Sequence, residues 1–167
     1  MTERALFNRR YTSYTPNGTE VWLINGAGVT TTSVSTQSFT ASEDLIQGEV
    51  VFVSGVWAVP ATAASGASNP EYFPVGLTSE GAFQNATVQV VLDDVAVVSA
   101  GNITADSSLV PGELYYLSKY KGEITRFQSA SGTVVRASGY GAVIPVGTAL
   151  STSELQVEIG TPVILTA

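Results

Sequence analysis

The sequence predicts an all-β fold, a compact barrel or sandwich that is built from a duplicated β unit and has an extended N-terminal arm. Three observations support this prediction. The segment Phe39–Ser54 recurs in recognisable form at Ile103–Ser118. About a dozen short apolar or alternating segments are separated by Gly, Pro, Asn and Asp turn residues. No long segment repeats its apolar residues with the 3.6-residue period of a helix.

The two recurring segments agree position by position and are followed by similar sequences. The identical pairs are Thr40/Thr104, Ala41/Ala105, Leu45/Leu109, Gly48/Gly112, Glu49/Glu113 and Ser54/Ser118. Each segment is followed by a Pro-Val-Gly tripeptide, at Pro74 and at Pro145, and then by an alternating apolar strand. This order predicts an internal repeat of residues 39–92 and 103–159. The alternative is that an all-β chain simply reuses similar turns and strands.

Residues 1–19 are interpreted as the N-terminal arm, and residues 20–167 as the β domain. The arm shows no apolar periodicity and ends in the turn segment Thr15–Gly18. It contains Arg4, Arg9 and Arg10, although the whole chain has a net charge of −7. Arginine and tyrosine contribute strongly when they are buried at interfaces, so we expect the arm to bind a partner; a frayed terminus is the alternative. The expected partner-binding residues are Phe7, Arg9, Arg10, Tyr11 and Tyr14.

Turn residues mark the expected hairpins of the β domain. Asn25-Gly26 favours a type I′ turn between Val21–Ile24 and Val29–Val34. The turn at Ser54-Gly55 predicts a second hairpin between Glu49–Ser54 and Val56–Val59. Two carboxylates remain solvated most easily in a tight turn, so Asp93-Asp94 predicts a third hairpin.

Three further segments complete the β domain. Pro60–Pro70 consists of small residues and is expected to form an exposed loop. Lys119–Gly122 is expected to join the strands Leu114–Ser118 and Glu123–Phe127. The apolar tail Pro162–Leu165 should be paired or buried, because a free apolar strand edge promotes aggregation.

The hairpin after Leu114 holds the only cluster of basic and aromatic residues outside the arm. Such a cluster suits a sugar or a protein partner, and alternating aromatic residues on a half-buried hairpin are the alternative. The cluster consists of Tyr115, Tyr116, Tyr120, Lys119, Lys121 and Arg126.

The composition argues against an enzyme. The chain has no cysteine and no histidine, which excludes Ser-His-Asp and Cys-His pairs and metal sites built from these residues. A glycosidase needs only two carboxylates in a cleft, but no pair is singled out. Glu49 and Glu113 occupy matching turn positions and are expected to fix turns. We therefore expect no catalytic residue, no metal site and no cofactor.

The surface chemistry indicates protein partners. Charged residues make up only 13% of the chain, and neutral Ser and Thr groups lose their water at lower cost than charged groups. A Thr-rich β protein without special partners is the alternative. The acidic β domain repels nucleic acid and anionic membranes. The sequence shows no signal peptide and no apolar run of about 18 residues, so we expect neither a nucleic-acid nor a membrane partner.

Three segments, Gly48–Trp57, Leu109–Ser118 and Pro145–Val157, carry a family resemblance. The chain between residues 40 and 160 resembles the β modules of tailed-bacteriophage virion proteins, which occur in capsid decoration (cement) proteins and in tail fibres. The resemblance implies a non-enzymatic structural role in the virion, commonly as a homotrimer. It carries no catalytic residues, and the arm lies outside it.

The expected function is therefore that of a capsid cement protein. Such a protein is made in the host cytoplasm, binds the major capsid protein on the outer shell of the virion and stabilises it, here with the arm lying along capsid subunits. The alternative is a tail-fibre or receptor-binding module. In that case the Pro60–Pro70 loop or the hairpin with Tyr115, Tyr116 and Lys121 contacts a glycan or protein of the host surface.

Overall fold

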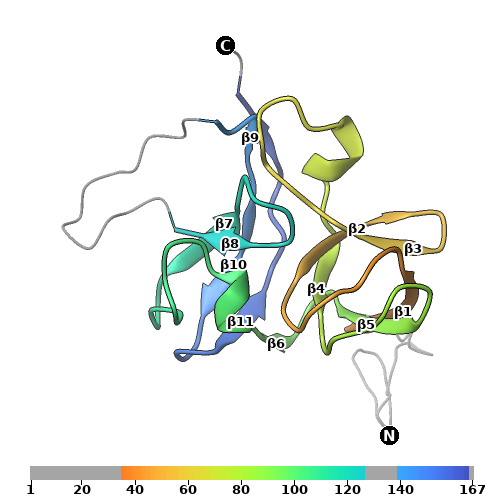
Figure 1. The fold of residues 1–167 in the computed structure, drawn as a ribbon. Helices are drawn as coiled ribbons and strands as arrows, with labels where there is room; N and C mark the ends of the chain where they lie inside the picture. Colours follow the sequence, from red (N-terminus) through yellow and green to blue (C-terminus); the bar gives the residue numbers. More distant parts are fainter. Residues whose placement is uncertain (1–34, 127–138, 166–167) are drawn as a thin grey trace, which may run out of the picture. The chain divides into compact units, whose positions relative to one another are not determined.

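The computed structural model describes residues 35–126 and 139–165, and all of them belong to one compact unit (Figure 1). They form an all-β structure with three sheets and two short 3₁₀ turns. Within these residues no helix is long and apolar enough to span a membrane. The expected arm and the hairpin around Asn25-Gly26 lie outside the described residues.

The first sheet closes into a five-stranded barrel. Its strand order is β1-β3-β2-β4-β5, and β5 returns to β1. The hairpin predicted at Gly55 is confirmed, since β2 and β3 pair across this glycine, which has a φ of 64°. A positive φ is accessible to glycine without steric cost. The strands are β1 Thr36–Ala41, β2 Val50–Ser54, β3 Trp57–Pro60, β4 Gly76–Thr78 and β5 Thr87–Val91.

The second sheet has five strands in the order β6-β11-β10-β7-β8. Its strands are β6 Val95–Val97, β7 Leu114–Leu117, β8 Ile124–Thr125, β10 Pro145–Ala149 and β11 Glu154–Val157. The predicted pairing across Lys119–Gly122 is confirmed between β7 and β8. A small third sheet pairs β9 Ala142–Val143 with β12 Val163–Ile164, and the 3₁₀ turns are η1 Asn69–Tyr72 and η2 Ala100–Asn102.

The strands of the two five-stranded sheets are connected in the same way. Equivalent hydrogen bonds also occur in both sheets. The Gly48 amide donates to the Thr78 carbonyl at 2.9 Å, and the Gly112 amide donates to the Ala149 carbonyl at 2.8 Å. The amides of Thr78 and Ala149 in turn donate to the carbonyl oxygens of Glu49 and Glu113, at 3.0 Å in both cases. Thr40 at the end of β1 matches Thr104, which follows η2, since their amides donate to the Val56 and Ile124 carbonyls at 2.9 Å in both cases. The predicted internal repeat of residues 39–92 and 103–159 stays a prediction. For brevity, residues 36–92 are called the first repeat below, and residues 95–157 the second repeat.

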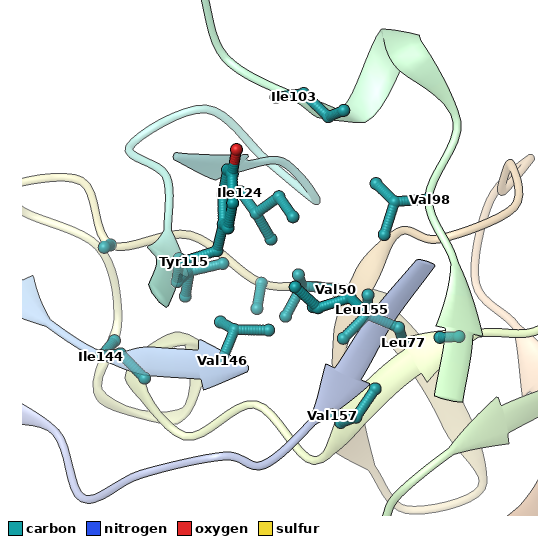
Figure 2. Packing of buried hydrophobic residues seen from close by; sticks show 14 of the residues in the cluster. Val50, Leu77, Val98, Ile103, Tyr115, Ile124, Ile144, Val146, Leu155 and Val157 are labelled. Carbon is teal, nitrogen blue, oxygen red and sulfur yellow. The ribbon is translucent and has the colours of Figure 1, made fainter. Parts of the chain in front are cut away.

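The core shows how the two repeats are joined. The interior of the barrel holds a small cluster that comes from the first repeat alone and includes Val51 on β2. Neighbouring strand residues point to opposite faces, so Val50 and Phe52 point out of the barrel. They pack with Leu77 against residues of the second repeat, among them Leu155, in one continuous buried cluster (Figure 2). The outer face of the barrel therefore covers the inner face of the second sheet.

The prediction of a hairpin at Asp93-Asp94 is wrong. β5 pairs with β1 and β4, while β6 pairs with β11. Because the barrel is closed, both edges of β5 are already occupied, and β6 has no edge of β5 on which to pair. The turn instead carries the chain from the first repeat into the second, with both aspartates exposed.

The prediction of an exposed loop at Pro60–Pro70 is wrong for its first half. Pro60–Ala63 is buried, and exposure begins near Ser65. The Ala61 amide donates to the Val50 carbonyl at 2.9 Å, and the Ala63 amide donates to the Ser118 carbonyl at 2.9 Å. The segment thus bonds to both repeats. Its small side chains allow the backbone to approach both sheets closely, whereas the sequence had suggested a solvated loop.

Candidate interface groove

A groove of about 320 Å³ opens on the first repeat, where the start of β1 extends past β3. It lies between β1 and the turn that joins β2 to β3. None of the side chains that line it is charged. The lining residues are Gln37, Ser38, Phe39, Thr40, Gly55, Val56 and Thr87.

The groove follows the part of β1 that does not pair with β3. β1 pairs with β5 from Thr36 to Thr40, but with β3 only at Thr40 and Ala41. The Thr40 amide donates to the Val56 carbonyl at 2.9 Å, on the β3 side. Because backbone groups alternate in direction along a strand, Thr36 and Ser38 face the same side as Thr40. No strand among residues 35–126 and 139–165 pairs with Thr36 and Ser38 on that side.

Apolar side chains lie beside this edge. Val56 is 64% exposed and Trp57 is 39% exposed, at the turn between β2 and β3. Phe39 is partly buried and packs against the interior cluster of the barrel. Tryptophan is among the residues that contribute most to protein interfaces. The groove therefore combines an apolar rim with a part of β1 that no described strand pairs with, and these features suit the binding of a polypeptide.

The expected arm residues Phe7, Arg9, Arg10, Tyr11 and Tyr14 lie outside the described residues, so their role stays a prediction.

The expected basic and aromatic cluster is divided between core and surface. Tyr115 is fully buried, and its hydroxyl oxygen accepts a hydrogen bond from the Val110 amide at 2.9 Å. Burial raises the pKa of this hydroxyl, although the Val110 bond opposes the rise. Tyr115 therefore belongs to the core and cannot contact a glycan.

Outside the core, Lys119 and Arg126 of this cluster contact different side chains. Tyr120 is 53% exposed. The Lys119 ammonium lies 5.7 Å from the ring centre of Tyr120 and 5.9 Å from that of Tyr140, within the range of cation–π attraction. The Arg126 guanidinium lies 3.4 Å from a carboxylate oxygen of Asp106.

Glu49 has a structural role in its turn. Its carboxylate accepts a hydrogen bond from the Ile46 amide at 2.8 Å. Burial raises the pKa of this carboxyl, and the carboxylates of Glu43 and Glu123 add to the rise, while the Ile46 bond opposes it. Among residues 35–126 and 139–165, no three carboxylates are grouped so that they could hold a metal ion.

The sequence analysis did not single out the groove residues. One feature could have indicated them: Val56 and Trp57 follow Gly55 directly, so two large apolar residues stand at a turn, where solvent exposure is the rule. The unpaired edge of β1 has no signature in the sequence, because it depends on where β3 begins. In comparisons with known proteins, no family model matches the chain, and no significantly similar curated protein was found.

Proposed function

We propose that this protein is a non-enzymatic structural protein of a tailed-bacteriophage virion, a cement protein that binds the major capsid protein on the outer shell and stabilises it. The observation that carries this proposal is the uncharged groove along the part of β1 that no described strand pairs with on that side, with Val56 and Trp57 at its rim. A surface of this kind binds protein backbone and apolar side chains. The barrel that carries this groove shares a core with the second repeat. The groove is therefore part of a packed structure.

The physical basis of the proposed role is selective binding to the assembled shell. A protein that binds the lattice but not the free subunit stabilises the lattice by mass action. Weak contacts repeated by the symmetry of the shell add up through multivalency. In this proposal the arm supplies a second contact, through Phe7, Arg9, Arg10, Tyr11 and Tyr14. Its positive charge suits an acidic capsid surface, whereas the rest of the chain is acidic.

The test uses particles that lack this protein. The full chain is incubated with them, and sedimentation and bound copies per particle are measured. Stoichiometric binding to shells is the expected result. Removal of residues 1–16 should abolish binding, while the circular dichroism of the β domain stays unchanged. An Arg9→Ala/Arg10→Ala variant separates the charge of the arm from its length. A full chain that does not bind shells would overturn the proposal.

The second candidate is a tail-fibre or receptor-binding module that contacts a host glycan or protein. The exposed Tyr120, in the turn between β7 and β8, favours it. Copy number distinguishes the two candidates. A cement protein should be about as abundant in the virion as the major capsid protein, and a fibre module should be scarce.

A further inference from the structure

Among the described residues, the most exposed large apolar side chain is that of Phe83, in the turn that joins β4 to β5. Phe83 is 80% exposed, and Ile46, in the turn before β2, is 47% exposed. The residues that precede them, Ala82 and Leu45, pair in an isolated antiparallel bridge and pack in the interior cluster of the barrel. Because successive side chains along a strand point to opposite faces, Ile46 and Phe83 both point outward. The two turns, residues 43–46 and 80–85, therefore form one exposed apolar surface, called the Phe83 tip below.

Two glycines leave Ile46 accessible on this surface. A Cβ atom on Gly81 would lie 3.8 Å from the Cα atom of Ile46, and a Cβ atom on Gly101 would lie 3.8 Å from its Cδ1 atom. Both glycines are themselves exposed. Because neither glycine has a side chain, they flank Ile46 without covering it, and a partner can reach this side chain.

Hydrogen bonds fix the turn that carries Phe83. The Gln84 amide donates to a carboxylate oxygen of Asp44 at 2.9 Å, and the Gln84 side-chain amide donates to the Ser42 carbonyl at 2.9 Å. The Phe83 carbonyl accepts a hydrogen bond from the Ala86 amide at 2.9 Å. A backbone that is already ordered loses little conformational freedom on binding. The turn therefore presents Phe83 in a preorganised position.

The charges of the tip indicate what kind of partner it fits. Glu43, Asp44 and Glu80 are exposed in the same two turns, and residues 35–118 contain no lysine or arginine. Like charges brought together at an interface oppose binding, whereas opposite charges favour it. The tip therefore suits a protein surface that has an apolar pocket with basic residues at its edge.

We propose that the Phe83 tip docks onto the major capsid protein, with Phe83 and Ile46 inserted into an apolar pocket edged by lysine or arginine residues. This inference rests on the proposed function and adds a contact to it. The groove has no charged lining residue, and the arm is positively charged, so the tip is a third surface with its own chemistry. Aromatic side chains are enriched in protein interfaces. Because the tip and the arm carry opposite charges, they select different regions of the shell and together fix the orientation of the β domain on it.

The test compares variants of the full chain on particles that lack this protein, with bound copies per particle measured against concentration. Phe83→Ser should weaken binding by about tenfold or more. Phe73→Ser is the matched control, because Phe73 is 51% exposed and lies outside the tip, and it should bind as the wild type does. Glu80→Lys should weaken binding, whereas Glu154→Lys, the same charge change at an exposed site on β11, should not. These sites are all exposed, so the circular dichroism of each variant should match that of the wild type.

The outcomes separate this inference from the cement function. A wild-type chain that binds shells, together with a Phe83→Ser variant that binds them equally well, overturns the docking of the tip and leaves the cement function in place. Equal losses for Phe83→Ser and Phe73→Ser also overturn it, as does a Glu80→Lys variant that binds as tightly as the wild type. A wild-type chain that does not bind shells overturns both proposals.

Discussion

At the scale of single residues, one matching interior position holds side chains of different size in the two repeats. Val51 in the barrel corresponds to Tyr115 in the second sheet, since both follow the first residue of a strand that starts after the turn glycine. Both are fully buried. Tyrosine fills more volume, and its hydroxyl bonds to the Val110 amide. The smaller Val51 therefore suits the closed barrel of the first repeat, and the larger Tyr115 suits the open sheet of the second.

Glu49 provides a test at this scale. Because burial raises the pKa of the Glu49 carboxyl, the folded protein binds the proton of this carboxyl more tightly than the unfolded chain does. The stability that comes from this tighter proton binding is complete below the ordinary pKa of a carboxyl group. It is lost as pH rises through the raised pKa of Glu49. At neutral pH the buried charge is therefore unfavourable. We expect Glu49→Gln to raise the Tm at pH 7, and the gain to shrink near pH 4, close to the ordinary pKa of a glutamate.

The control for this experiment is Glu113→Gln, which removes the same charge from the matching turn of the second repeat. Thermal unfolding followed by circular dichroism at both pH values checks the expectation. A Glu49→Gln variant that is less stable than wild type at pH 7 would show that the bond to the Ile46 amide needs the charged carboxylate.

At the scale of elements, the segment Pro60–Ala63 links the two repeats through hydrogen bonds to both. The segment begins at the last residue of β3. Its amides donate to the carbonyls of Val50 in the first repeat and Ser118 in the second, and the Ala61 carbonyl accepts a hydrogen bond from the Gly122 amide. Thr62 adds a side-chain bond to the Lys119 carbonyl at 2.8 Å. Ala61 and Ala63 have no exposed surface. Only small side chains fit here, which explains a composition that resembles that of a loop.

A larger residue in this segment should separate the repeats. We expect Ala63→Leu to destabilise the protein by about 1–3 kcal/mol, because the added methylene groups have no space between the two sheets. Ser65→Leu, two residues later at an exposed site, should change stability by less than about 0.5 kcal/mol. Urea unfolding measures both. Equal effects of the two substitutions would contradict the packing described for Ala63.

At the scale of the whole described unit, the outer faces of the two repeats differ in how deeply they are buried. The outward positions Val50 and Leu77 of the barrel are buried under the second sheet. The residues at the matching positions are Leu114, which is 41% exposed, and Thr148, which is partly exposed. The outer face of the second repeat is therefore less buried than that of the first, and Leu114 contributes apolar surface there.

Because one core spans both repeats, they should unfold together. Leu77 lies in the barrel but packs in the cluster shared with the second sheet (Figure 2). We expect Leu77→Ala to cost about 2–5 kcal/mol and to lower amide hydrogen-exchange protection equally at Val51 in the barrel and at Leu155 in the second sheet. Thermal unfolding should remain a single transition. Two transitions, with loss of protection in the barrel alone, would show that the repeats are independent.

The sequence by itself determined the local properties of this protein. The all-β class, the hairpin at Gly55 and the pairing across Lys119–Gly122 follow from turn chemistry and alternation, which act between residues close in the chain. The recurrence of the Gly-Glu turn likewise reflects the same backbone bonds at Gly48 and at Gly112.

Only the tertiary structure decided which edges and faces remain free. Closure of the barrel occupies both edges of β5, so Asp93-Asp94 became a link between repeats where a hairpin was expected. Packing of the two sheets buried Pro60–Ala63 and Tyr115, and the early end of the β1–β3 pairing opened the groove at Ser38. Each outcome depends on contacts between residues far apart in sequence. Burial and strand pairing are properties of the assembled sheets, and no local pattern of residues encodes them.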